Sequence, residues 1–361
     1  MDEGIYLLWL TRLDGLGPVK QKALLGAFGN GGGVYGASPE QLRCVPGISE
    51  HNLSVLTKNR DLDETAAFAK SLDEKGIRVV TICDSFYPDL LREIHDPPVL
   101  LYLLGSLPDE GMPKVSLIGA RRCTDYGLRA ARDLSRSLAA NGVVVVSGMA
   151  SGIDSMAHKG AIEGGGLTVA VLGCGVDVCY PSENRDLRRQ ILENGCLISE
   201  YPPEEKPLPG YFPARNRIIS GLSRITVVTE AAKRSGTLIT VGQALDQGRE
   251  VMAVPGNINS RQSEGTNSMI KDGAGVVTEA DDILRALGIE RKARRTDKPN
   301  RSANLAHNEK IVYDLVGPAP VYLDEIIEKS NSQAQTINYI LMMLELRGLI
   351  RKLPGQRYVR E

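Results

Sequence analysis

The sequence predicts an α/β protein built on a doubly wound, mostly parallel sheet, and two observations carry that prediction. The first is the run Val143–Val146, four consecutive valines that leave no polar face and suit a strand buried on both sides. The second is the repetition of such apolar runs along residues 64–289, each followed by a helical pattern. Strands and helices that alternate in this way form one sheet with helices on both faces.

Length and composition bound the other possibilities. A chain of 361 residues should hold two or three domains, and its net charge of −1 means that any nucleic-acid site must be a local patch. It has no run of about 18 apolar residues and no basic leader, so we expect neither a membrane span nor a signal peptide. Its six cysteines and four histidines are scattered, which argues against a zinc site and favours a reduced, cytoplasmic setting.

Residues 1–63 are expected to form a small helical domain. Two glycine hairpins, Gly15–Pro18 and Val45–Ser49, each stand between helical stretches. A helix, glycine hairpin and helix given twice resembles a helix-hairpin-helix (SAM-like) domain, in which backbone N–H groups hold a nucleic-acid phosphate. A bundle used for protein contact is an equal alternative, because few basic residues beyond Lys20 and Lys22 flank the hairpins.

Residues 64–289 are expected to form the large domain, which opens with a helix over 64–75. The predicted strands are Ile77–Ile82, Val99–Leu104, Val115–Ile118, Val143–Val146, Leu167–Leu172, Ile225–Val228 and Val251–Val254. Ligands bind such sheets at the carboxyl ends of the strands. The small residues from Ser147 to Gly152 would let a ligand approach the backbone, whereas a turn that only packs helix on strand is the alternative.

The motifs of nucleotide enzymes are missing from this sheet. The first strand-to-helix turn, Gly119–Gly127, lacks G-x-G-x-x-G and carries Arg121 and Arg122 where that fingerprint needs glycine. The second strand ends in Ser147 and not in the acid that would hold a ribose. No G-x-x-x-x-G-K-[ST] run occurs either. We therefore expect no nucleotide cofactor, and ligand binding that needs neither ATP nor a metal.

Positive charge and small residues gather instead at the expected carboxyl edge. Pro213–Arg217 is expected to precede the helix that feeds the strand Ile225–Val228, and Lys233–Thr237 to open the next helix. Arginine forks match phosphate oxygens, and helix N-termini add N–H donors. The residues predicted to bind DNA phosphate are Gly119, Arg121, Arg122, Ser147, Gly148, Arg215, Asn216, Arg217, Ser235, Gly236 and Thr237. The alternative is structural: Arg215 and Arg217 would then pair with Glu200 or Glu230.

Two catalytic arrangements compete with binding. Ser147, Asp154 and His158 could form a nucleophilic triad, but a triad needs the histidine between the serine and the acid. We interpret Asp154 as a helix cap and His158 as satisfied by a local partner. Glu230 with Ser235–Thr237 is distantly similar to nucleotide phosphoribohydrolases, whose Gly-Gly-x-Gly-Thr-x-x-Glu run does not match. We expect no enzyme, and a nucleotide-processing hydrolase on the same fold is the alternative.

Seven motifs resemble the DNA-processing protein A family (DprA/Smf). They are Ile118–Arg121, Ser147–His158, Val171–Gly175, Tyr180–Asn184, Ser199–Pro202, Phe212–Ile219 and Arg234–Thr240, continued by Pro255-Gly256 and Gly265–Asn267. The resemblance is collinear from about Ile77 to Asp282. It implies an extended Rossmann domain that binds single-stranded DNA without a cofactor. It also implies a homodimer that loads the RecA recombinase during natural transformation, and the apolar pattern in Ile270–Leu287 fits a dimer. Many members carry lysine where this chain has Ser182, which leaves one backbone contact open.

The remaining chain is expected to form a basic linker, 290–304, and a winged-helix domain, 305–361. The predicted elements are helices Glu309–Leu315, Leu323–Lys329 and Gln333–Arg347, then a hairpin of Leu349–Lys352 and Arg357–Arg360. The third helix would read DNA, yet its first turns carry no positive charge. The charge lies on the wing, at Arg351, Lys352, Arg357 and Arg360. This pattern favours a protein contact or weak wing–phosphate binding over a transcription regulator that reads duplex DNA.

Overall fold

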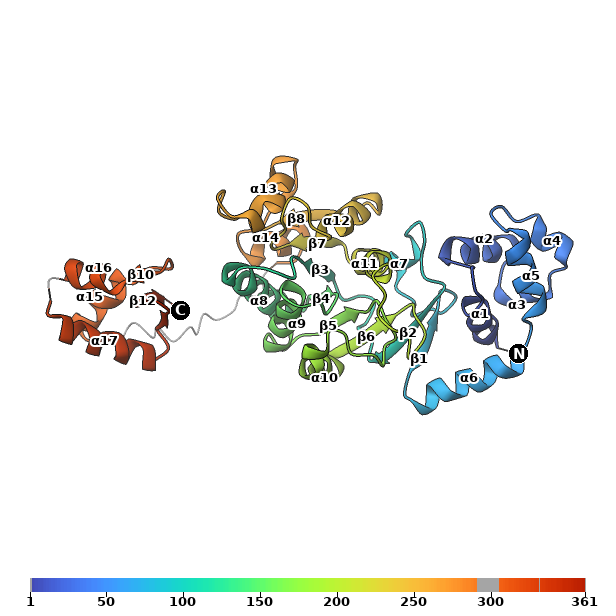
Figure 1. Ribbon diagram of the computed structural model, residues 1–361, viewed down its shortest axis with the longest axis horizontal. Coiled ribbons are helices and arrows are strands. Elements are labelled where there is room, and N and C mark those ends of the chain that lie inside the picture. Colours follow the sequence, from blue (N-terminus) through green and yellow to red (C-terminus); the bar gives the residue numbers. More distant parts are fainter. Residues whose placement is uncertain (1, 291–304, 331, 361) are drawn as a thin grey trace. The chain divides into compact units, whose positions relative to one another are not determined.

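The computed structural model describes residues 2–290, 305–330 and 332–360. The chain divides into two compact units, Met1–Arg291 and Lys292–Glu361, which are shown in Figure 1 and are described separately. The predicted linker 290–304 lies outside the described residues, apart from its first residue. Within the described ranges, no helix is both long and apolar enough to cross a membrane.

A sheet of nine strands organises the described residues of the larger unit, in the order β1-β2-β6-β5-β4-β3-β7-β8-β9 (Figure 1). The strands are β1 (Arg78–Thr81), β2 (Leu100–Gly105), β3 (Lys114–Ile118), β4 (Val144–Ser147), β5 (Thr168–Val171), β6 (Gly195–Ser199), β7 (Ile225–Val228), β8 (Glu250–Ala253) and β9 (Gly275–Val276). Strands β3 to β9 are parallel, and β1 and β2 join antiparallel at one edge. The chain winds from β3 to β6 on one side and from β7 to β9 on the other, so the prediction of a doubly wound, mostly parallel sheet is confirmed.

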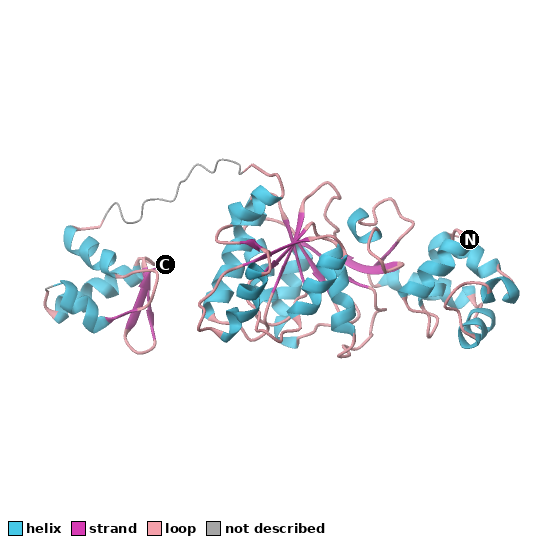
Figure 2. Cartoon of the chain, turned by 90° about the horizontal axis from the view of Figure 1, so that it is seen from above, coloured by secondary structure: helices cyan, strands magenta, loops and turns pink. Residues whose placement is uncertain are grey.

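Strand β4 shows why the valine run predicts a buried strand. Val144 and Val146 belong to one hydrophobic core, and Val143 and Val145 belong to the other, because successive side chains point to opposite faces. Helices cover both faces (Figure 2). One core includes side chains of α8 (Asp125–Ala140), α9 (Ile153–Glu163) and α14 (Ala280–Ala286), and α10 (Arg185–Glu193) packs on β5 and β6. The other core includes side chains of α7 (Asp89–Arg92), α11 (Tyr211–Gly221), α12 (Thr237–Asp246) and α13 (Glu264–Lys271).

The structure differs from the sequence-based expectation at two elements that shape the site. Strand β6 was not predicted, because its buried apolar run is only Cys196–Ile198 and periodicity cannot identify so short a run. The prediction that Pro213–Arg217 precedes a helix is wrong, because these residues lie inside α11. Pro213 falls in the first turn of that helix, where proline is tolerated because no N–H is needed.

Six helices form the N-terminal region of the larger unit: α1 (Glu3–Thr11), α2 (Pro18–Phe28), α3 (Gly31–Gly36), α4 (Pro39–Arg43), α5 (Glu50–Lys58) and α6 (Leu62–Glu74). The two glycine hairpins lie against each other, since the Asn52 amide donates to the Gly15 carbonyl (3.0 Å) and accepts from Lys20 Nζ (2.8 Å). Lys22 donates to the carbonyls of Ile94 and His95 (3.3 and 2.8 Å), which belong to the segment before β2. Both hairpin lysines therefore bind acceptors of the chain itself.

The smaller unit is a winged helix, as predicted. Its elements are α15 (His307–Leu315), β10 (Val321–Tyr322), α16 (Leu323–Ser330), α17 (Ala334–Leu346), β11 (Ile350–Leu353) and β12 (Arg357–Arg360), with strand order β10-β12-β11. The third helix, α17, has no lysine or arginine, and it exposes Tyr339, Met342 and Leu346. An exposed apolar face without positive charge suits a protein contact better than a phosphate backbone.

Candidate nucleic-acid interface

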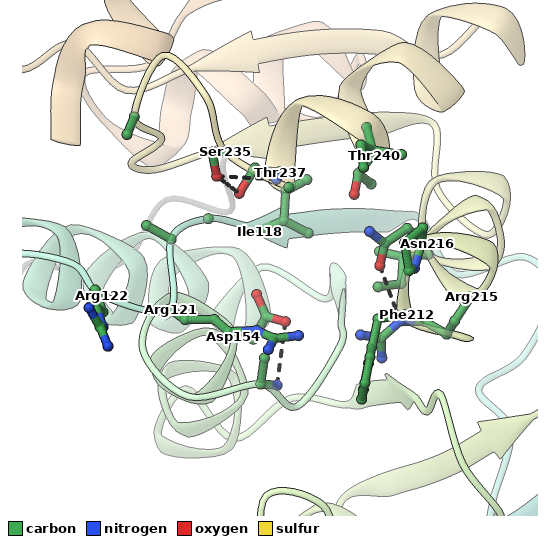
Figure 3. Close-up of a pocket in the computed structure, with 18 of the residues that line it drawn as sticks. Ile118, Arg121, Arg122, Asp154, Phe212, Arg215, Asn216, Ser235, Thr237 and Thr240 are labelled. Carbon is green, nitrogen blue, oxygen red and sulfur yellow. Dashed lines mark hydrogen bonds between the residues drawn. The ribbon is translucent and has the colours of Figure 1, made fainter. Parts of the chain in front are cut away.

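A cleft of about 640 Å³ opens at the carboxyl edge of the sheet (Figure 3). It lies where β3 and β7 are neighbours, the point from which the chain winds in opposite directions and at which α/β sheets bind their ligands. Its walls are the loop after β3, the first half of α11 and the start of α12. The predicted residues that line it are Gly119, Arg121, Arg122, Arg215, Asn216, Ser235, Gly236 and Thr237.

Ser147, which ends β4, and Gly148, which follows it, lie beneath the cleft and do not line it, whereas Ala150 of the same turn does. Ser147 is fully buried and its hydroxyl donates to the Leu117 carbonyl (2.7 Å). The Gly148 carbonyl accepts from Arg215 Nη1 (2.9 Å), and a side chain at Gly148 would collide with the Arg215 guanidinium and the Asp154 carboxylate. Ser147 and Gly148 are small because other groups pack closely against them. They therefore fit the alternative in which the turn packs helix on strand and does not contact a ligand.

Arg215 forms the floor of the cleft. Only 4% of its surface is exposed, and its guanidinium donates to the carbonyls of Gly148 and Val171. Burial lowers the pKa of Arg215 to about 10, and the neighbouring Asp154 opposes that shift. Burial likewise raises the pKa of Asp154, and Arg215 opposes it. Arg215 is buried and already donates to two carbonyls, so it adds little accessible charge to the cleft.

Arg217 faces away from the cleft, although it is only two residues along the same helix. It is 5% exposed, and it makes hydrogen bonds to both carboxylate oxygens of Glu200 (3.0 and 2.5 Å). Its Nε lies 3.0 Å from a carboxylate oxygen of Asp96. The pairing with Glu200 is the structural alternative that the sequence left open. A phosphate could reach this guanidinium only by displacing two carboxylates, so we leave Arg217 out of the contact set.

Three arginines supply the accessible positive charge. Arg121, Arg122 and Arg234 line the cleft, are exposed, and have no carboxylate partner among the described residues. The Arg121 guanidinium lies over the ring of Phe212, 5.2 Å from its centroid. The Phe212 ring is in turn 5.4 Å from the ring of Tyr180. The cleft therefore combines unpaired cations with aromatic faces.

Sequence reasoning missed the two aromatic residues and named Arg234 only as one residue of a basic stretch. Phe212 directly precedes the Pro213–Arg217 stretch, and Tyr180 opens the Tyr-Pro motif. An aromatic residue beside each motif was the available signal, because nucleic-acid sites interleave aromatic and basic side chains. Only the fold shows that the two rings meet.

The start of α12 closes one side of the cleft. The Ser235 hydroxyl accepts from the Thr237 backbone N–H (3.2 Å) and donates to the Thr237 hydroxyl (2.9 Å). This local cap leaves the positive end of the helix dipole facing the cleft, where Gly236 has no side chain to block an anion.

The N-terminus of α8, unlike that of α12, is not open to an anion from outside the chain. The buried Glu230 carboxylate accepts from the backbone N–H and the hydroxyl of Thr124 (2.8 and 2.6 Å), and Gly127 leaves it room. In a dinucleotide fold, the pyrophosphate binds at the start of the helix that follows the first strand. Here a carboxylate of the chain already takes those donors, so the geometry argues against a dinucleotide at this helix.

The candidate triad does not assemble, because Asp154 lies close to Ser147 whereas His158 is engaged with Thr168. The Ser147 hydroxyl is committed to Leu117, and Asp154 lies beside Arg215. His158 is buried, and its Nδ1 lies 2.7 Å from the hydroxyl of Thr168. Burial lowers the pKa of His158 to about 3, so the imidazole is neutral. Across the described residues, no group of three or more histidine, cysteine, aspartate or glutamate side chains could hold a metal ion.

The fold and the cleft define a class: a doubly wound α/β protein without a dinucleotide fingerprint, whose switch point carries unpaired arginines and aromatic rings. Comparison with known families gives the particular group. The model described as DNA recombination-mediator protein A matches residues 78–288, and the model described as DprA winged helix domain matches residues 296–356. The chain belongs to the DNA recombination-mediator protein A (DprA/Smf) family, as its motifs suggested.

Individual relatives agree over most of the chain. Protein Smf of Synechocystis sp. is 33% identical over 394 residues and covers 99% of both chains. DNA processing protein DprA of Streptococcus pneumoniae is 45% identical over 204 residues, which are 56% of this chain and 72% of the relative. The X-ray structure of the Streptococcus pneumoniae protein superposes with a TM-score of 0.69 at 34% identity, covering 79% of this chain and 98% of that chain.

A second solved structure is DNA processing protein A from Helicobacter pylori, described for its single-stranded DNA binding mode. It has a TM-score of 0.52 and 30% identity, and it covers 58% of this chain and 95% of that chain.

Proposed function

We propose that this chain binds single-stranded DNA in the cleft at the carboxyl edge of the sheet. The observation that carries the proposal is the meeting of the unpaired Arg121, Arg122 and Arg234 with the ring of Phe212 in one cleft. Cations hold a phosphodiester backbone, and aromatic faces stack on unpaired bases of any sequence. The single-stranded DNA binding mode described for the Helicobacter pylori relative supports the proposal.

A single strand fits this cleft better than a duplex does. The rings of Phe212 and Tyr180 form one wall, and a base can reach them only when it is not paired and stacked within a duplex. The cations around them contact phosphate and carry no information on base identity. Binding should therefore depend strongly on salt and weakly on sequence.

The proposed contact set differs from the predicted one in both directions. It keeps Gly119, Arg121, Arg122, Asn216, Ser235, Gly236 and Thr237, and it adds Arg234, Phe212 and Tyr180. Arg215, Ser147 and Gly148 support the cleft from below, and Arg217 holds α11. Ser182 follows Tyr180 by two residues and is exposed, so a hydroxyl stands where many members of the family carry lysine.

We further propose the family role that the resemblance implies. In this role the chain is a cytoplasmic homodimer that protects incoming single-stranded DNA and loads the RecA recombinase in recombination and natural transformation, without catalysis and without a cofactor. The proposed domains are the helical region 1–63, the sheet domain 64–289 and the winged helix 305–361, the last two joined by the linker 290–304, and the first two pack together in one compact unit. A dimer through the segment Ile270–Leu287 is supported by Val276 of β9, whose side chain is 45% exposed at the free edge of the sheet.

A binding panel tests the proposal. Fluorescence anisotropy with labelled single-stranded DNA, the matching duplex and RNA, each at two salt concentrations without ATP or metal, should show tightest binding to the single strand. A preference for particular duplexes would instead favour a transcription regulator. Release of a base or a sugar phosphate from nucleotides would favour the hydrolase that the shared fold offers as an alternative. Light scattering at micromolar concentration should show a dimer, and a monomer would contradict the proposed homodimer.

A further inference from the structure

One large apolar side chain is strongly exposed in the loop that supplies Gln262 to the cleft. Ile258 is 86% exposed, more than any other exposed large hydrophobic residue of the described ranges. It lies between β8 and α13, in a loop that runs from Pro255 to Ser263. Burying such a side chain would stabilise the fold, so its position calls for a reason beyond folding.

The loop is held in shape by its own contacts. The Asn267 side chain both donates to the carbonyl and accepts from the N–H of Gly256 (3.0 and 3.1 Å). The Tyr126 hydroxyl donates to the Pro255 carbonyl (2.8 Å). At the tip, the Asn257 side chain accepts from the Asn259 N–H (2.9 Å), which turns the chain around Ile258. Ile258 is thus presented by an ordered turn.

The same loop is continuous with the cleft. Gln262 lines the cleft, and the start of α13 is tied to the segment before Arg234, because the Gly265 N–H donates to the Ala231 carbonyl (2.8 Å). Arg261 follows Ile258 by three residues; Arg261 and Arg234 are both exposed, and neither has a carboxylate partner within the described ranges. An apolar tip next to unpaired cations matches a ligand with apolar faces and a phosphate backbone.

We infer that Ile258 acts as a wedge that contacts a base. It packs against a base of the single strand where the strand passes out of the cleft, on the side formed by α12. This inference rests on the proposed function and adds a contact outside the cleft. Apolar side chains that insert between bases separate them and pack on their faces, and they leave the phosphates to neighbouring cations. The two asparagines beside Ile258 are also exposed, so the whole tip of the loop is accessible to a ligand.

The test uses the full chain and compares Ile258→Ala with Leu245→Ala. Leu245 is a matched control, because it is 60% exposed in the last turn of α12, away from the helix end that lines the cleft. Ile258→Ala should weaken binding to a short oligonucleotide by about fivefold, near the lower end of the range for one stacked base. The slope of log affinity against log salt should not change, because no charge is lost. Leu245→Ala should bind like the unchanged chain.

A strand with single abasic positions identifies the contacted base. At one position, base removal should cost the unchanged chain the same factor, and Ile258→Ala should lose nothing further on that strand. Equal affinity of Ile258→Ala and the unchanged chain overturns the wedge. So does a change of oligomeric state in light scattering, which would make the tip a contact between copies. Arg121→Ala distinguishes failure of the wedge from failure of the proposed function. If Arg121→Ala weakens binding and Ile258→Ala does not, only the wedge is wrong. If the unchanged chain does not bind single-stranded DNA, the proposed function is wrong.

Discussion

Two pairs of arginines, Arg121 with Arg122 and Arg215 with Arg217, have opposite environments. Arg121 and Arg122 follow β3 in a loop, are exposed, and have no carboxylate partner among the described residues. Arg215 and Arg217 lie in α11, are 4% and 5% exposed, and are held by carbonyls or carboxylates of distant segments. The difference shows that the same residue type can bind a ligand or hold the wall of its site. The deciding factor is whether the chain already supplies the guanidinium with acceptors.

The largest expected effect concerns the buried arginines of α11. Arg217→Ala should lower the free energy of unfolding by about 3–5 kcal/mol, because Glu200 and Asp96 would keep their charges without a partner. Chemical denaturation followed by circular dichroism measures the change. Arg122→Ala is the control and should unfold like the unchanged chain. An Arg217→Ala chain that has normal stability but binds DNA weakly would show that Arg217 contacts DNA.

Buried groups near Arg215 should also give the chain a pH dependence. Burial lowers the pKa of His158 in the folded chain to about 3. At a pH between this value and the ordinary histidine pKa, His158 is protonated in the unfolded chain and neutral in the folded chain. Stability is then complete above the ordinary histidine pKa of about 6.5 and falls as the pH drops from there toward 3. The raised pKa of Asp154 acts in the opposite direction, because the folded chain then binds that proton more tightly than the unfolded chain does. Thermal unfolding of the unchanged chain and of His158→Gln should show a weaker acid loss in the variant, and parallel curves would contradict this.

Phe212 extends the comparison to the aromatic wall. Phe212→Ala should weaken binding of single-stranded DNA by about 1–3 kcal/mol, the range for one stacked base, with no change in salt slope. Phe212→Tyr keeps the aromatic face and should bind nearly normally. Anisotropy titrations at several salt concentrations measure both quantities. A loss of affinity in Phe212→Tyr equal to that in Phe212→Ala would show that the ring does not stack on a base.

The exposed arginines should each have a smaller effect. Arg121→Ala removes one phosphate contact and should lower the salt slope by roughly 0.7, which is about fourfold in affinity at about 0.15 M salt. The loss should be similar for all sequences, and the melting temperature should not change. An Arg121→Ala, Arg122→Ala chain that folds and keeps full affinity would remove the cleft from the proposal.

The smallest effect is expected in the winged helix. Arg357 lies in β12, with its guanidinium over the ring of Tyr322 at 6.0 Å and its Nε bonded to the Pro354 carbonyl. Arg357→Ala should change DNA affinity less than Arg121→Ala does, because α17 beside the wing offers no cation to share a phosphate backbone. A larger loss with duplex than with single strand would show that the wing binds DNA.

Local pattern was enough to predict the architecture. The valine run and its repeats predict a parallel sheet, since a strand that is apolar on every position must be buried on both faces. The winged helix followed from helical spacing and a hairpin. The motifs around Gly148 and Arg215 were enough to indicate the family. Strand β6 was not predicted, because the short run Cys196–Ile198 becomes a strand through its pairing with β5 and β2, and periodicity cannot show such pairing.

The roles of the site residues were decided only by tertiary structure. The sequence determined which side chains have the chemistry to bind phosphate, since arginine is charged wherever it lies. It could not determine which of them stay available, because the partners of Arg217 are Asp96, 121 residues away, and Glu200, 17 residues away. Packing likewise brought Phe212 under Arg121. Burial and pairing depend on contacts between segments that are distant in the chain, and only the folded sheet brings those segments together.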